Sequence, residues 1–193
     1  MAAIQTDYAP RSSAEIQAYD PRRGEEVQRR HELLAGYLRI KGLDALLLRR
    51  PGNIAWLTCG GEVQRRGCCD AAASVLVTPE ARVLLCNNVD SPLLFDGPLS
   101  GLGFQLKERP WYESPQAICD DICCGRRVAT DEPSAGAERV DQDLADFRQR
   151  LGEWEESHLR ELGRDLTHPV EATCRNCEEG DTEAEIAGQL LHR

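Results

Sequence analysis

Residues 42–58 read GLDALLLRRPGNIAWLT, and this stretch decides the fold. Residues 44–48 within it form a short apolar run, which is typical of a strand buried on both faces. Residues 51–57 follow with a pattern that predicts a short helical turn. Upstream, residues 24–41 place apolar side chains at helical spacing, and Gly42 is expected to end that helix. The stretch therefore predicts a helix, a buried strand and a second short helix in succession.

Downstream, short helices and strands continue to alternate. Residues 60–70 form a polar, glycine-rich loop, and a β-hairpin is expected to follow it at 73–78 and 82–86. The further elements expected before residue 131 are helices at 88–97 and 113–124 and strands at 101–106 and 127–130. This order predicts an α/β fold, a mixed β-sheet flanked by helices, over about residues 24–150.

The last third of the chain reads as helix from Asp141 onward. Between residues 151 and 177, apolar residues recur every three to five positions and form one stripe on a long helix. Pro169 falls inside this pattern, so a kink or break is expected near His168. Residues 182–185 form a capping-box sequence that begins another helix. A helical segment is thus expected over 151–193.

Charge and hydropathy exclude some classes of protein. The 193 residues carry a net charge of -10, and residues 131–193 hold 17 acidic against 7 basic side chains. Such an acidic chain lacks the clustered Lys and Arg of a nucleic-acid-binding surface. No run reaches the roughly 20 apolar residues of a membrane span. Residues 1–23 also lack the apolar run of a signal peptide, so they are expected to be a flexible lead-in to a cytoplasmic protein.

The nine cysteines are odd in number and irregularly spaced. Adjacent pairs at 68–69 and 123–124 do not suit a disulfide framework, so reduced thiols that pack as small apolar residues are expected. Cys174 and Cys177 form a Cys-x-x-Cys pair near a helix C-terminus, where core packing is favoured over redox or zinc chemistry. A zinc site would need two more ligands, which the cysteines at 119–124 could supply.

Other motifs do not assign a catalytic, cofactor-binding or metal-ligating residue. His31-Glu32 begins like a zinc-peptidase helix signature, but Ala35 occupies the position of the second histidine. His31 is therefore expected at the surface. The sequence also lacks a nucleophile elbow, a phosphate-binding loop and a dinucleotide-binding glycine motif.

Two segments together carry a family resemblance. Residues 42–58, with the helix that contains residues 29–34, resemble the opening of the N-terminal domain of creatinase, prolidase and aminopeptidase P. That family typically has Pro-x-Asn-Ile, an aromatic residue and Leu-Thr-Gly, whereas this chain has Cys59 before its glycines. Residues 144–151 and 179–187 are similar to the entry into the family's pita-bread catalytic domain, where Gly-x-Thr-Glu-x-Glu-Ile-Ala recurs.

The resemblance implies a domain organisation and a function. It implies a creatinase/prolidase N-terminal-like domain at 24–150 and the helical start of an incomplete pita-bread domain at 151–193. In the family, two Asp, one His and two Glu hold a dinuclear metal and all follow the Gly-x-Thr-Glu helix, so no ligand maps onto this chain. The expected function is a non-catalytic oligomerisation or substrate-access domain, or a truncated form, of an Xaa-Pro peptidase-like metallopeptidase. The alternative is a small cysteine-based zinc-binding or redox module.

The resemblance also suggests where a substrate and a partner chain would meet this protein. In relatives, the N-terminal domain can lend residues to the rim of another subunit's active site. The nearest equivalents here are Trp56, Arg65 and Arg66, because arginine binds carboxylates through two hydrogen bonds. The apolar stripe of the last third needs a partner surface, so a homo-oligomer that forms through the C-terminal helices is expected.

Overall fold

A computed structural model describes residues 20–65, 67–134 and 136–192. Contacts divide the chain into two compact units, Met1–Leu144 and Ala145–Arg193. Most of the lead-in expected at residues 1–23 lies outside the described residues, and its last three residues belong to the first helix. The predicted assignment of residues 151–193 to a second, catalytic-type domain stays a prediction.

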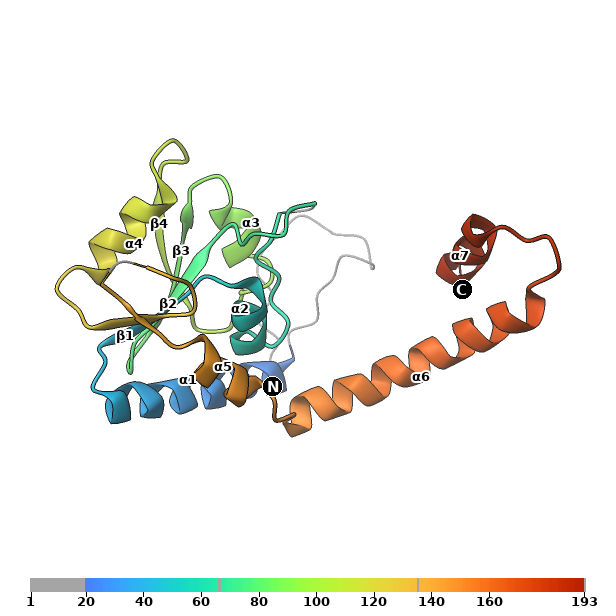
Figure 1. The fold of residues 1–193 in the computed structure, drawn as a ribbon, viewed down its shortest axis with the longest axis horizontal. Helices are drawn as coiled ribbons and strands as arrows, with labels where there is room; N and C mark the ends of the chain where they lie inside the picture. The colour runs from blue at the N-terminus through green and yellow to red at the C-terminus, as the bar shows by residue number, and fades with distance from the viewer. Residues whose placement is uncertain (1–19, 66, 135, 193) are drawn as a thin grey trace, which may run out of the picture. The chain divides into compact units, whose positions relative to one another are not determined.

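The elements of the first unit alternate between helix and strand (Figure 1). They are α1 (Pro21–Lys41), β1 (Ala45–Leu48), α2 (Pro51–Leu57), β2 (Ser74–Val77), β3 (Arg82–Asn87), α3 (Ser91–Phe95), β4 (Gln105–Arg109), α4 (Pro115–Cys123), β5 (Val128–Thr130) and β6 (Glu138–Arg139). A further helix, α5 (Asp141–Arg148), crosses the boundary between the two units.

Local sequence signals fix both ends of α1. The Asp20 side chain accepts a hydrogen bond from the backbone N–H of Arg22, and Pro21 occupies the first turn, where its missing N–H costs nothing. This cap starts the helix three residues earlier than expected. At the other end, Gly42 has a φ of 66°, a conformation that glycine adopts without a Cβ clash. The expectation that Gly42 ends the helix is confirmed.

The strands form one sheet in the order β4-β3-β2-β1-β5-β6. Strand β2 pairs antiparallel with both β1 and β3, whereas the β1–β5, β3–β4 and β5–β6 pairs are parallel. The other strands of this sheet therefore all run in one direction, opposite to β2. As a result, their carboxyl ends share one edge of the sheet with the amino end of β2.

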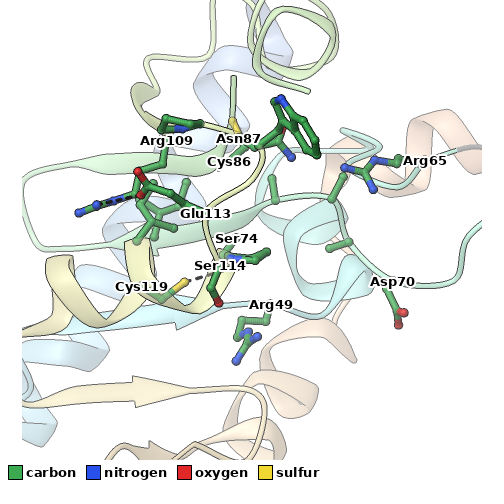
Figure 2. Close-up of a pocket in the computed structure, with 18 of the residues that line it drawn as sticks. Arg49, Arg65, Asp70, Ser74, Cys86, Asn87, Arg109, Glu113, Ser114 and Cys119 are labelled. Atoms are coloured by element: carbon green, nitrogen blue, oxygen red, sulfur yellow. Dashed lines mark hydrogen bonds and ion pairs between the residues drawn. The ribbon is translucent and has the colours of Figure 1, made fainter. Parts of the chain in front are cut away.

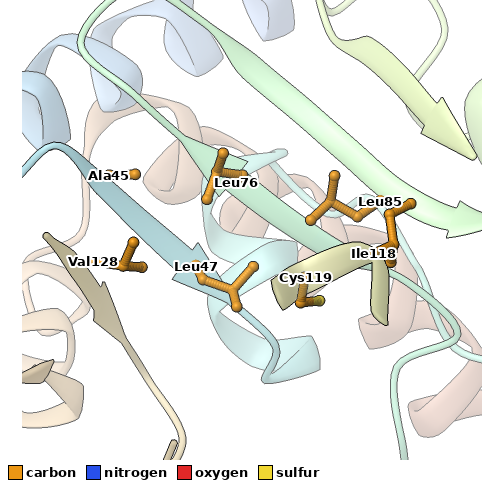
Figure 3. Close-up of a cluster of buried hydrophobic side chains, with 7 residues drawn as sticks. All are labelled: Ala45, Leu47, Leu76, Leu85, Ile118, Cys119 and Val128. Atoms are coloured by element: carbon orange, nitrogen blue, oxygen red, sulfur yellow. The ribbon is translucent and has the colours of Figure 1, made fainter. Parts of the chain in front are cut away.

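The central strand β1 is buried on both faces, as its apolar run indicated. On one face, α4 covers a core cluster composed of Ala45, Leu47, Leu76, Leu85, Ile118, Cys119 and Val128 (Figure 3). Leu46 and Leu48 alternate with the β1 members of this cluster and are completely buried on the opposite face. Helix α1 contacts β2 and α2 and contributes the completely buried Leu34 and Leu38. The fold class, a mixed sheet flanked by helices, is confirmed.

Two strands differ from the sequence-based expectation. The strand expected at 101–106 is observed as β4 at Gln105–Arg109, because Gly101 and Gly103 have φ values of 74° and 70° and form a turn. Leu102 and Phe104, which follow these two glycines, are nevertheless buried, and this explains why the stretch resembled a strand. Strand β6 was not anticipated, because both of its residues are polar and exposed.

The second unit contains α6 (Glu153–Asn176) and α7 (Glu183–His192), which contact each other. Helix α6 continues through Pro169, so a break near His168 is wrong, whereas a kink there stays a prediction. The missing N–H of Pro169 would have paired with the carbonyl of Asp165, and Asp165 is exposed, where water can satisfy that group. The α7 start is confirmed, since Thr182 and Glu185 exchange capping hydrogen bonds.

Helix α6 presents apolar side chains that are half exposed. Leu159, Leu162, Leu166 and Val170 have exposed fractions of 53, 52, 50 and 45%. Their spacing of three and four residues places them on one face of the helix. Among the described helices, including α6, none is both long and apolar enough to cross a lipid bilayer.

Candidate functional site

A cavity of 290 Å³ opens at the sheet edge where the carboxyl ends of the strands gather (Figure 2). Its walls come from Arg49 after β1, Asn87 at the end of β3, Arg109 at the end of β4 and Ser74 at the amino end of β2. Ser114, the N-cap of α4, also lines it. In open α/β sheets, ligands typically bind outside the carboxyl ends of the strands. The cavity is therefore the candidate ligand pocket of the first unit.

Arg109 forms one wall of the pocket and is fixed by two carboxylates. Its Nη1 lies 3.2 Å from the Glu113 carboxylate, and its Nη2 lies 3.0 Å from Asp121. Its Nε is buried without a hydrogen-bond partner. These contacts orient the guanidinium and leave one buried donor unsatisfied, which is a costly arrangement unless another group approaches it.

Arg49 lies between the α4 N-terminus and the chain that follows β5. Its Nη1 donates to the amide oxygen of Gln116 at 3.2 Å, and its Nε lies 3.5 Å from the Glu132 carboxylate. The first partner is neutral, and the second is beyond ordinary hydrogen-bond length. The Arg49 guanidinium is therefore less neutralised by these contacts than that of Arg109.

Asp131 fixes the backbone from which Arg49 projects. This carboxylate is completely buried and accepts hydrogen bonds from the backbone N–H groups of Arg49 and Arg50 at 2.8 and 3.0 Å. It also accepts from the side-chain amide of Asn53 at 2.8 Å. Asp131 thus satisfies donors at the start of α2 and joins the end of β5 to the end of β1.

Arg65 reaches the pocket from the loop between α2 and β2. Its Nε and Nη2 both donate to the carboxylate of Asp90, and the Asn87 amide donates to the same carboxylate. The hydrogen bonds from Arg65 hold the pKa of Asp90 below its usual value. In Figure 2, Arg65 and Arg109 lie on opposite sides of the pocket.

Two thiols line the inner part of the pocket. Burial raises the pKa of Cys86 to about 12 and also raises the pKa of Cys119, whose Sγ lies 4.0 Å from the Ser74 hydroxyl. The thiolate, rather than the thiol, is the nucleophile and the metal ligand. Because both groups remain protonated near neutral pH, the pocket is suited to reversible binding rather than to thiol chemistry.

The side chains that line the pocket carry equal numbers of positive and negative charges, and Asp90 and Asp121 next to it pair with two of its arginines. Its charged lining residues are Arg49, Arg65, Arg109, Asp70, Glu113 and Glu132. Within the described parts of the chain, no group of three or more His, Cys, Asp or Glu residues is arranged to hold a metal ion. With three arginines and three carboxylates, the lining offers both cationic and anionic partners to a ligand.

The structure separates the three residues expected at a substrate rim. Arg65 lines the pocket. Trp56 does not, and its half-buried ring instead stacks on the guanidinium of the buried Arg30, 5.2 Å away. Arg66 lies outside the described residues. A role for these residues at a substrate rim stays a prediction.

Two further expectations about side chains are wrong. His31 is buried rather than at the surface, and its Nε2 lies 2.8 Å from the carbonyl oxygen of Thr78, because α1 packs this face against the β2–β3 turn. Cys174 and Cys177 are exposed at the end of α6 rather than packed in a core.

No sequence motif marked Arg49, Arg109 or Asp131 as parts of a site. Each lies at, or directly after, the end of a strand whose carboxyl end meets the pocket edge. The sequence signal that could have identified these site residues is a charged residue at or directly after the end of a predicted strand. The sequence alone does not show which strand ends lie together, because that depends on the strand order.

Comparisons with solved structures identify the fold. The prolidase from Thermococcus sibiricus aligns with 86% of this chain at a TM-score of 0.65 and 12% identity. Dipeptidase PepE from Mycobacterium ulcerans aligns with 88% at 0.64 and 15% identity, and the X-Pro aminopeptidase from Thermotoga maritima with 84% at 0.61 and 17% identity. The aligned parts cover 48, 49 and 48% of those chains, so this chain spans about half their length.

Comparisons with protein-family models and with curated proteins give no match. At the identities found among solved structures, the likeness shows the fold. The chain therefore has the fold of about half of a prolidase or X-Pro aminopeptidase, and the predicted resemblance to the creatinase-type fold is confirmed at this level.

Proposed function

We propose that this chain is the non-catalytic N-terminal part of an Xaa-Pro peptidase-like protein, where it shapes substrate access and supports assembly. The observation that carries this proposal is the alignment of more than four-fifths of the chain with about half of several Xaa-Pro peptidases. The alternative of a cysteine-based zinc or redox module is not favoured, because among the described residues Cys174 and Cys177 do not come together with a third possible metal ligand.

Two properties of the described residues support the proposal. The pocket offers arginine and carboxylate side chains at a sheet edge, which suits the recognition of a polar ligand. Helix α6 presents an apolar face that another surface would stabilise. Recognition and assembly therefore fit this chain better than covalent chemistry does.

Assaying the purified full chain for hydrolysis of Xaa-Pro dipeptides tests the non-catalytic role. We expect no turnover above buffer with added Mn²⁺, Co²⁺ or Zn²⁺, and the same result with creatine. A metal-dependent prolidase assayed in parallel controls for the substrates and the detection. Turnover that a chelator abolishes, and that survives repurification, would show that this chain is itself an enzyme.

We further propose that the chain forms a homo-oligomer through the apolar face of α6. Burying a Leu or Val side chain rather than leaving it exposed stabilises an assembly by about 1.5–3 kcal/mol. The half-exposed Leu159, Leu162, Leu166 and Val170 on one face would each contribute a share of this.

A further inference from the structure

We propose that the pocket at the carboxyl edge of the sheet reversibly binds a small zwitterion, such as a free amino acid. The proposal goes beyond the role in access and assembly and does not depend on it, because the described residues that line the pocket all lie in the first unit. It rests on four features of the pocket, namely its charge balance, its least neutralised arginine, its carboxylates and its size.

The charge balance of the lining selects the class of ligand. Three guanidinium groups and three carboxylates face the cavity or its mouth. A ligand with only a negative charge would be repelled by the carboxylates, and a ligand with only a positive charge would be repelled by the arginines. A ligand with one carboxylate and one ammonium group can pair with both signs at once, so it has the best electrostatic complementarity.

The carboxylate of the ligand is best placed against Arg49. Arg65 and Arg109 already hold carboxylates within hydrogen-bond distance, whereas Arg49 has a neutral amide and a carboxylate at 3.5 Å. Ser114, at the N-terminus of the nine-residue helix α4, lines the same cavity. The positive end of the helix dipole adds to the attraction that Arg49 exerts on an anionic group.

Glu113 and Glu132 are the carboxylates that would receive the ammonium group. Both side chains are partly exposed, and Arg109 donates a hydrogen bond of 3.2 Å to one of the two Glu113 oxygens. A carboxylate has about four lone-pair positions, so this contact leaves acceptor capacity for an ammonium group. Glu132 lies beside Arg49 and would bring the two ligand charges close together.

The size and the remaining lining favour a small ligand with an apolar side chain. A volume of 290 Å³ is at the lower end of the roughly 300–1,000 Å³ typical of ligand pockets. Leu85 and Ile118 lie behind the cavity wall but are almost completely buried, and Trp111, whose exposed fraction is 67%, contributes an aromatic ring. Because Cys86 and Cys119 are held protonated, binding would be non-covalent.

Three probes that share a phenylethyl group test the ligand class by calorimetric titration of the full chain. L-phenylalanine carries both charges, 3-phenylpropionate lacks the ammonium group, and 2-phenylethylamine lacks the carboxylate. We expect saturable binding of phenylalanine near or below about 1 mM and at least about tenfold weaker binding of each analogue. Phenylalanine that fails to saturate at about 10 mM, or an analogue that binds equally well, would overturn the proposal.

Two variants test the location of the site by different mechanisms. Arg49→Gln removes the cation but keeps the backbone N–H that Asp131 requires, and we expect at least about tenfold weaker phenylalanine binding. Ala71→Tyr keeps every charge and fills part of the cavity, and we expect it to abolish binding.

Arg160→Gln is the matched control for Arg49→Gln, because it removes an arginine from α6 and should leave the affinity unchanged. Urea unfolding of each variant separates lost binding from lost folding. If Arg49→Gln and Ala71→Tyr are folded and bind phenylalanine like the parent chain, the site is elsewhere and the proposal fails.

Discussion

At the scale of single residues, a few buried polar groups hold the pocket edge in place. Asp131 joins the ends of β1 and β5 through three hydrogen bonds, and Asp90 holds Arg65 over the pocket. A buried carboxylate is stable only when its oxygens are hydrogen-bonded. These residues therefore determine both the stability of the first unit and the geometry of its site.

Asp131→Ala should destabilise the folded chain by about 3 kcal/mol or more, because it leaves several buried donors unsatisfied. Urea unfolding of the full chain measures the free energy of unfolding. The neighbouring Glu132→Gln is the control, since its ion pair is long and half exposed and should change stability by less than about 1 kcal/mol. A loss below about 1 kcal/mol for Asp131→Ala would contradict the assigned role.

The Arg65–Asp90 pair should make stability depend on pH. The pKa of Asp90 is lowered in the folded chain, chiefly by hydrogen bonds from Arg65, so the ionised carboxylate stabilises the fold. This contribution is complete above an unfolded-state pKa of about 3.9 and is lost as pH falls through the lower folded-state pKa. Parent and Asp90→Asn should therefore differ in free energy of unfolding at pH 6, and the difference should shrink below about pH 4.

Asp70→Asn is the control for that titration, because Asp70 is exposed and no ion pair of its side chain is present among the described contacts. Added salt should reduce the Asp90 effect, since the Arg65 side chain is 58% exposed. A difference between parent and Asp90→Asn that stays constant from pH 6 to pH 3 would refute the assignment.

At the scale of elements, the predictions that the structure confirms are those based on strong local sequence patterns. The apolar run at β1 and the Gly42 stop reproduce the structure, because each rests on short-range chemistry. Strand β4 was predicted too early in the chain, because the buried side chains of the preceding turn resemble the apolar pattern of a strand. Strand β6 and the pocket could not be predicted, since a polar edge strand has no apolar signal and the pocket depends on the strand order.

Helix α6 gives a test of how a proline is tolerated within a helix. Pro169→Ala restores an N–H that can donate to the carbonyl of Asp165, and the change should stabilise α6 locally by up to about 3 kcal/mol. Hydrogen exchange measured by mass spectrometry should show slower exchange around residues 165–173. Unchanged exchange there would mean that the proline costs this helix little.

Gly163→Ala is the matched control for that substitution. An added Cβ at Gly163 meets no atom within 4 Å, so alanine fits and should stabilise the helix by about 0.5–1 kcal/mol. Its effect should centre six residues, or nearly two turns, before that of Pro169→Ala. The two profiles together separate general helix propensity from the specific loss of one hydrogen bond.

At the scale of the whole molecule, the two compact units differ in how far they bury their apolar side chains. The first unit buries its sheet between helices, whereas the main helix of the second unit presents an apolar face. An amphipathic helix gains most of its stability in proteins by packing that face. The half-exposed apolar face of α6 is therefore where association is expected.

Replacing Leu162 and Leu166 together by Glu should convert self-associated chains to monomers, because two charges would enter the apolar face of α6. Light scattering over a range of concentrations measures the change. Glu161→Gln with Arg164→Gln is the control, since it alters exposed polar residues of the same helix. A parent chain that is monomeric at every concentration, and whose residues 151–193 resist proteolysis, would refute assembly through α6.

The position of β1 between β2 and β5 also has a consequence for biosynthesis. Ala45 pairs with Val128, so one edge of β1 stays open until that distant segment has left the ribosome. At roughly 5–20 residues per second, this takes several seconds, during which the apolar Ala45–Leu48 strand offers an unpaired edge. Nascent chains halted before residue 128 should therefore require chaperones and aggregate without them, whereas chains that have exposed β5 can close the sheet.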